Sequence, residues 1–213
     1  MSAIAPQLGT YGTGTAAQPC LVWRFDSAQR CIASAPVGGG IGTTRWVINA
    51  QVDKHYRRTD LGAHVDAIAA DCDCAGRGVG LLTAARVGAW QRAVDDGVVA
   101  DATVGVTLPI WAAAPGVPTV GAAPPGTINI VVQVPVRLSE AALVGAVISV
   151  TEAKTQALLE AGVPGTGTAS DAVCILCPPR GKAEAFAGPR ALWGARIARA
   201  VHAVVRAGLG ARP

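Results

Sequence analysis

A lysine, a glycine–threonine loop and an aspartate lie close together in the stretch TEAKTQALLEAGVPGTGTASDAV. If the preceding residues form a helix, Lys154 lies at about 20° from Leu143, in the middle of an apolar stripe, and Glu152 at about 180°, on the opposite face. Removing an ammonium group from water is costly, so such a lysine extends to solvent, pairs with a carboxylate or serves in a site. Asp171 is the partner that the sequence offers.

The Gly-Thr-Gly-Thr loop at residues 165–168 can serve a reaction or simply reverse the chain. Its glycines let backbone amides approach a ligand, and Thr166, Thr168 and nearby Ser170 add hydroxyls, which suits an anion cradle or an oxyanion hole. A plain turn explains the loop equally well. A P-loop is excluded because no Gly-Lys-Ser/Thr follows, and Gly-x-Ser-x-Gly and His-Glu-x-x-His motifs do not occur. These residues alone predict a small-molecule site near Lys154, Glu152, Asp171 and the loop.

The composition indicates a globular protein and disfavours several partners. Hydrophobic residues make up 51% of the 213 residues and charged residues 15%. The net charge of +4 is mild and the arginines are spread out, so nucleic-acid binding is not predicted. The first residues lack the charge and apolar core of a signal peptide, and no uninterrupted apolar run reaches the roughly 18 residues of a spanning helix. We therefore expect a cytoplasmic protein with no membrane partner.

The six cysteines raise the question of a metal site. The pairs Cys72–Cys74 and Cys174–Cys177 could supply the four thiolates of a zinc site. Residues three apart in a strand point to opposite faces, however, so Cys174 and Cys177 diverge. The three histidines are dispersed without metal-ligand spacing. We expect buried thiols and no metal.

The apolar patterns predict an α/β protein with a single domain, in which long helices pack on a mixed β-sheet. Apolar runs at residues 20–25 and 31–35 around a polar turn predict a hairpin, and residues 79–85 fit a strand or the start of a helix. The domain is expected over residues 19–213, after a flexible tail over residues 1–18. Further strands are predicted over residues 45–52, 98–108, 127–134 and 171–177, a Pro/Gly-rich loop over 116–126, and helices over 59–71, from 139 onward and over 189–208.

Five blocks follow one another in the second half of the chain, with RWVINAQV and GLLTAA earlier: PGTINIVV (125–132), LSEAALVGAV (138–147), TEAKTQAL (151–158), GTGTASDAV (165–173) and AGPRALWGARIARAV (187–201). In this order and spacing they resemble the adenosylcobinamide amidohydrolase family of corrinoid salvage. The combination of TEAKTQAL and GTGTASDAV is specific, although each alone is weak. The similarity extends over residues 34–206 and departs from the family at Leu82, where methionine is expected, and at Ala191, where a polar residue is common.

The resemblance implies hydrolysis of the amide that joins aminopropanol to a propionate arm of the corrin ring. Adenosylcobinamide would give adenosylcobyric acid and 1-aminopropan-2-ol. The corrinoid brings its own cobalt as part of the substrate, and no protein cofactor is implied.

Amide hydrolysis needs an activated nucleophile, support for the oxyanion and a proton for the leaving amine. Our hypothesis is that Glu152 or Asp171 is the general base for water, with Lys154 stabilising charge or donating the proton. A Ser or Thr nucleophile activated by Lys154 is the alternative. Glu152 and Lys154 can serve one site only if the helix is distorted or covered on both faces. The residues expected around the oxyanion and along the substrate are Thr127, Asn129, Thr166, Thr168 and Ser170.

Two other functions fit the same residues. The chain could be a corrinoid-binding carrier or regulator that keeps the family fold without catalysis, or a structural subunit whose Ala/Gly-rich faces serve assembly. An exposed apolar patch together with Lys154 ion-paired in a closed core would favour assembly. Self-association into a homo-oligomer is left open in each case.

Overall fold

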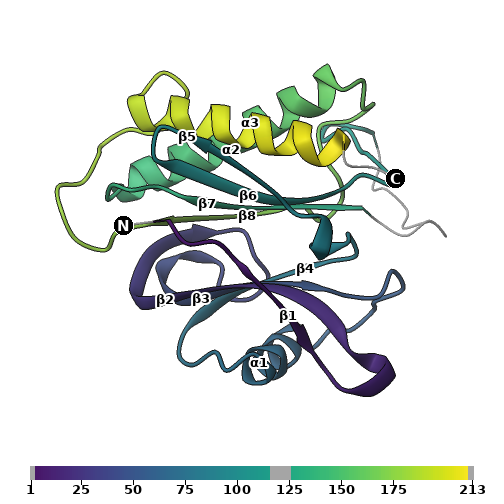
Figure 1. Cartoon of the computed structure of the whole chain (residues 1–213). Helices are drawn as coiled ribbons and strands as arrows, with labels where there is room; N and C mark the ends of the chain where they lie inside the picture. Colours follow the sequence, from purple (N-terminus) through teal and green to yellow (C-terminus); the bar gives the residue numbers. More distant parts are fainter. Residues whose placement is uncertain (1–2, 116–125, 211–213) are drawn as a thin grey trace.

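The computed structural model describes residues 3–115 and 126–210, which form one mixed β-sheet with helices packed on it (Figure 1). The predicted fold class is confirmed. The loop predicted over residues 116–126 lies outside the described residues, apart from Gly126. The elements in chain order are β1 (Gln7–Tyr11), η1 (Gly14–Ala16), β2 (Gln18–Ala33), β3 (Gly40–Gln51), α1 (Leu61–Asp71), β4 (Gly78–Thr83), η2 (Val87–Ala89), β5 (Gln91–Asp95), β6 (Val98–Gly105), β7 (Thr127–Gln133), α2 (Glu140–Glu160), β8 (Ala172–Cys177) and α3 (Leu192–Gly210).

The sheet folds back on itself. Its strand order is β4-β3-β2-β8-β7-β6-β5, and β1 pairs with β2. The pairs β3–β4 and β7–β8 are parallel, and the others are antiparallel. Strand β2 pairs with both β3 and β8, and through it the β1–β4 half continues into the β5–β8 half. Figure 1 shows the two halves as stacked layers, with α2 and α3 over the β5–β8 half and α1 on the far side of the β1–β4 half.

Three apolar clusters separate these four layers. The first lies between the two long helices and the β5–β8 half and includes Ile130 and Leu143. The second lies between the halves of the sheet and includes Leu81 and Leu176, and the third, with Ile68, lies between the β1–β4 half and α1. Strands β7 and β8 are covered on both faces, so all their residues are buried. The sequence of β8 is accordingly a continuous apolar run, whereas β7 also buries the polar residues Thr127, Asn129 and Gln133.

The N-terminal part of the chain differs from the prediction. The runs at residues 20–25 and 31–35 do not form a hairpin. They belong to the two ends of the single strand β2, whose register with β3 shifts between Arg24 and Gln29. A bulge releases polar residues from the ladder much as a turn does, which explains the error. Within the segment predicted to be a flexible tail, Gln7–Tyr11 forms β1 and pairs with β2.

The other predicted strands and helices lie close to their predicted positions, whereas β5 was not predicted. Residues 79–85, which fitted a strand or a helix start, belong mostly to the strand β4. The prediction that Ser139 caps the long helix is confirmed, because its side chain accepts a hydrogen bond from the Ala142 amide at 3.1 Å. Among the described helices, α2 alone has the length and apolar composition of a membrane span, with 44% of the apolar window buried in the protein. A core helix of a folded domain meets the same criterion, so this property does not by itself indicate a membrane protein.

The cysteines lie in the apolar clusters. Cys174 faces the space between the sheet halves and Cys177 the helices, so the two thiols diverge as strand geometry predicts. Burial raises the pKa of both thiols. In the part of the chain that the structure describes, no three His, Cys, Asp or Glu side chains are grouped so that they could hold a metal ion.

Candidate active site

The ends of four strands meet around one cavity. Parallel neighbours β7 and β8 begin side by side, at Thr127 and just after Asp171. From the other half of the sheet, parallel β3 and β4 end at the same place, where Thr83 is the last residue of β4. The cavity has a volume of about 490 Å³, within the range of small-molecule sites. Amino ends of one strand pair and carboxyl ends of the other therefore form its walls.

The lysine of α2 and the aspartate before β8 form an ion pair. Lys154 Nζ lies 2.5 Å from Asp171 Oδ2, and the two side chains are 11% and 12% exposed. This confirms the pairing inferred from the helical wheel. Gly167 lies against the pair: a Cβ atom there would be 2.6 Å from the lysine Nζ and closer still to the aspartate Oδ2. Position 167 therefore has no room for a side chain while the pair is in place.

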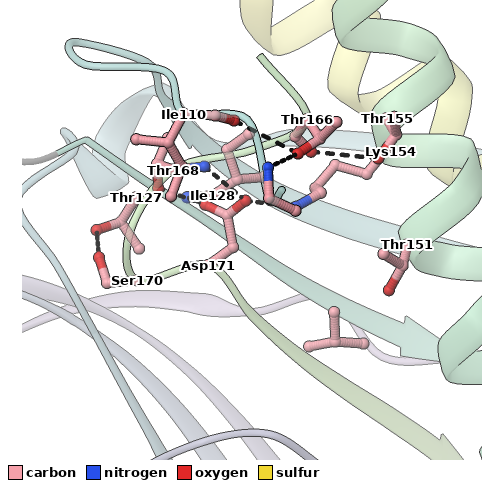
Figure 2. A network of polar contacts seen from close by, with 12 residues as sticks. Ile110, Thr127, Ile128, Thr151, Lys154, Thr155, Thr166, Thr168, Ser170 and Asp171 are labelled. Carbon is pink, nitrogen blue, oxygen red and sulfur yellow. Dashed lines mark hydrogen bonds and ion pairs between the residues drawn. The ribbon is translucent and has the colours of Figure 1, made fainter. Parts of the chain in front are cut away.

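The carboxylate of Asp171 accepts hydrogen bonds from four donors (Figure 2). Oδ2 accepts from the lysine and from the Thr168 amide at 3.1 Å, and Oδ1 accepts from Thr168 Oγ1 at 2.5 Å and from the Ile128 amide at 2.9 Å. A carboxylate offers about four lone-pair sites. This one is saturated, which fits a group that holds its neighbours in place better than one that activates water.

Two hydroxyl groups lie beside this carboxylate on the cavity wall. Thr127 Oγ1 and Ser170 Oγ are 2.8 Å apart, and both residues line the cavity. Thr166 has a different role, because its Oγ1 accepts from the Ala112 amide at 3.0 Å and its own amide donates to the Ile110 carbonyl at 2.8 Å. Thr166 therefore fastens the loop to residues 110–112, whereas Thr127 and Ser170 line the cavity, where a ligand can contact their hydroxyl groups.

Asn129 lies behind the cavity rather than on its wall. Its Nδ2 donates to Asn49 Oδ1 at 2.9 Å and to the Leu82 carbonyl at 3.1 Å, and Asn49 Nδ2 donates to Thr103 Oγ1 at 3.0 Å. The side chain is buried. This network joins the two halves of the sheet and gives Asn129 a place in the support of the cavity, and its role in substrate binding stays a prediction.

Glu152 lies apart from the other predicted residues. It is exposed on α2, whereas Lys154 on the same helix is buried. The helix is continuous through this region, so neither the distortion nor the double covering that would bring the two side chains together is present. The structure thus brings together Lys154, Thr168, Asp171, Thr127 and Ser170, and leaves Glu152 outside.

Sequence comparison places the chain in a family. The family model described as adenosylcobinamide amidohydrolase matches residues 7–212. An adenosylcobinamide amidohydrolase of Methanosarcina mazei is 32% identical over 188 residues, which cover 84% of this chain and 90% of that protein. The chain belongs to the adenosylcobinamide amidohydrolase family. A second relative of that name, from Halobacterium salinarum, is 42% identical over 91 residues, which cover 42% of this chain and 38% of that protein.

The family match extends over every described element of this adenosylcobinamide amidohydrolase-like chain, from β1 to α3. It begins at residue 7, where β1 begins, rather than at residue 19 as predicted for the domain. The β1–β2 pairing explains the earlier start, because β1 adds a strand to the same sheet.

One wall of the cavity in this member of the adenosylcobinamide amidohydrolase family was not predicted from the sequence. The segment after β3 lines it with Asp53, Lys54, Tyr56 and Arg58. Tyr56 Oη lies 2.6 Å from Nδ1 of His64, whose ring stacks on the tyrosine. Burial raises the pKa of Tyr56. Polar residues after a strand are common on any surface, so their type and spacing alone could not have marked them as part of a site.

Proposed function

We propose that this chain hydrolyses the amide between aminopropanol and the corrin propionate arm of adenosylcobinamide, giving adenosylcobyric acid and 1-aminopropan-2-ol. Membership of the adenosylcobinamide amidohydrolase family supports this proposal. The cavity of about 490 Å³ suits the aminopropanol arm. The corrin ring remains at the mouth, because a whole corrinoid is much larger than the ligands that such cavities enclose.

One observation carries the assignment: the buried ion pair of Lys154 and Asp171 lies at the wall of an open cavity, and Asp171 itself lines that cavity. In a structural subunit the pair would be enclosed in a core. Exposed apolar side chains such as Val144 and Ile148 on α2 are a feature that fits assembly. Desolvated charge beside a cavity is typical of a functional site. The geometry therefore favours a site over an assembly element.

The residues divide into two roles. Thr127 and Ser170 place hydroxyl donors at the cavity, where they can hold the carbonyl oxygen as it gains negative charge. Lys154 and Thr168 hold Asp171, and Asp171 in turn holds the Ile128 amide next to Thr127. In this arrangement Asp171 and Lys154 are positioning residues for the hydroxyl pair.

The proposal is tested by incubating the purified protein with adenosylcobinamide and measuring adenosylcobyric acid by mass spectrometry. We expect product to accumulate with repeated turnover. Binding of the corrinoid without product would establish the carrier function instead, and neither binding nor product from folded protein would overturn both. Mass analysis of acid-quenched protein distinguishes the two nucleophiles, because attack by Ser170 or Thr127 leaves an acyl adduct and attack by water leaves none.

Replacing Glu152 by glutamine is expected to leave turnover within about two-fold of the original, because surface substitutions away from a site change little. The residue is exposed on α2 and away from the cavity lining. Steady-state kinetics with adenosylcobinamide measure the effect. A loss of ten-fold or more (about 1.4 kcal/mol) would restore Glu152 as a candidate base.

The localisation and the partners of the protein are part of the same proposal. We assign the chain to the cytoplasm, with a corrinoid as its ligand and without nucleic-acid or membrane partners. The mild charge and the burial of one face of α2 support this assignment. Self-association is measured by light scattering of the purified protein.

A further inference from the structure

The segment that follows β3 brings a second carboxylate to the cavity. The Val52 amide donates to the Thr83 carbonyl at 2.8 Å, which ties this segment to the end of β4. The chain then turns, with the Tyr56 amide donating to the Asp53 carbonyl at 2.9 Å. From the residues that the structure describes, the Asp53 side chain accepts one hydrogen bond, at Oδ1 from the His55 amide at 2.7 Å. Its other acceptor positions are available to water or to a ligand.

Other polar groups of the described cavity wall are poor proton acceptors. Asp171 has its acceptor positions filled by four donors. Lys54 and Arg58 carry donors and no acceptor. Tyr56 is engaged with His64, and burial raises its pKa, which keeps its proton in place at neutral pH.

The two halves of the sheet contribute different chemistry to the cavity. Asp53 comes from the β1–β4 half, and Thr127 and Ser170 come from the β5–β8 half. An amide that enters between the halves therefore meets hydroxyl donors from one side and a carboxylate with free acceptor positions from the other. General base catalysis on bound water requires this separation, because the base has to reach the water while the donors reach the carbonyl oxygen.

We propose that Asp53 is the catalytic general base, an assignment that rests on the proposed amide hydrolysis. Asp53 takes a proton from a water molecule as the water oxygen bonds to the amide carbon, and the carbonyl electron pair moves to the oxygen held by Thr127 and Ser170. When the C–N bond breaks, Asp53 returns the proton to the leaving nitrogen. The products are the carboxylic acid and the amine, and Asp53 is again a carboxylate.

Asp53→Asn is the direct test. The substitution keeps the size of the side chain and removes its ability to take a proton. We expect kcat to fall by about 100- to 1,000-fold, with KM changed less than about three-fold. The acid limb of the kcat/KM pH profile, caused by protonation of the base, should disappear in the residual activity. Asp53→Glu should recover part of the rate with an acid limb restored.

Asp66→Asn is the matched control, because Asp66 is an exposed aspartate on α1 outside the cavity lining. It should match the unmodified protein in kcat, KM and pH profile. Corrinoid binding, followed by the absorbance of the corrin ring, and thermal unfolding of each variant show whether Asp53→Asn binds substrate and is folded.

The outcomes separate this proposal from the proposed function. If the unmodified protein forms adenosylcobyric acid and Asp53→Asn does so at the same rate with the same acid limb, Asp53 is not the base and the hydrolase function stands. A fall in kcat with the acid limb unchanged also overturns the assignment, since it points to an effect on structure. If the unmodified protein binds the corrinoid but forms no product, the hydrolase function fails and the role of Asp53 fails with it.

Discussion

Asp171→Asn is expected to lower turnover of adenosylcobinamide by about 100-fold or more. The amide nitrogen of asparagine replaces one acceptor oxygen, so a donor faces either the Lys154 ammonium or the Ile128 amide, which both donate to the carboxylate now. The start of β7 then moves, and a displacement of about 1 Å at the reacting groups costs about 100-fold in rate. The substitution also removes the negative charge that Asp171 places beside the buried lysine, which lowers the free energy of unfolding by about 3 to 5 kcal/mol. Steady-state kinetics at low temperature and urea unfolding measure the two effects.

Asp95→Asn provides the control for this substitution. Asp95 pairs with Arg199 at 2.6 Å on the surface, away from the cavity. Its loss should change the free energy of unfolding by no more than about 1 kcal/mol and leave turnover unchanged. Asp171→Asn with the turnover of the original protein would remove Asp171 from the site.

Lys154→Met completes a double-mutant cycle with Asp171→Asn. Each single substitution leaves a buried group facing a partner that no longer complements it, whereas the double variant removes both charges. We expect the double variant to lose less stability than the sum of the two single losses, because residues in contact are coupled. Additive losses would show that the ion pair contributes little as a pair.

Gly167→Ala is expected to have the second large effect, although it removes no functional group. The new Cβ atom needs space that Lys154 Nζ and Asp171 Oδ2 occupy, so the ion pair has to separate or the loop has to move. We expect turnover to fall by about 100-fold and the free energy of unfolding to fall by about 1 to 3 kcal/mol. The same kinetic and unfolding measurements apply.

Gly188→Ala is the matched glycine substitution, since an added Cβ there meets no atom within 4 Å. Its turnover and stability should stay close to those of the original protein. If Gly167→Ala behaves in the same way, the loop does not set the position of the ion pair, and the view of Asp171 as a positioning residue loses its main support.

The sequence predicted those parts of the site that depend on local periodicity. A helix start at Ser139 and a period of 3.6 residues are enough to place Lys154 among apolar residues and Glu152 opposite it, and the structure agrees on both. The short connection from α2 to β8 made Asp171 the natural partner. These inferences need no knowledge of how the distant strands are arranged.

The sequence could not predict features that depend on the folding of the sheet onto itself. Thr127 and Asn129 lie on the same face of β7, because strand residues alternate with a period of two. Thr127 lies at the open end of the strand, whereas Asn129, two residues further along, is covered by Asn49 from the other half. Asp53 is far from Ser170 in the chain and reaches the same cavity only because β3 ends opposite the start of β8. No local pattern contains that information.

The cavity lies where the two sheet halves meet, so ligand binding there affects the stability of the whole fold. Strand β2 pairs with β3 on one side and β8 on the other, so the halves are continuous through a single strand. A ligand that fills the cavity contacts side chains from both halves and connects them. Its binding free energy therefore adds to the resistance of the whole chain to unfolding, rather than to that of one layer.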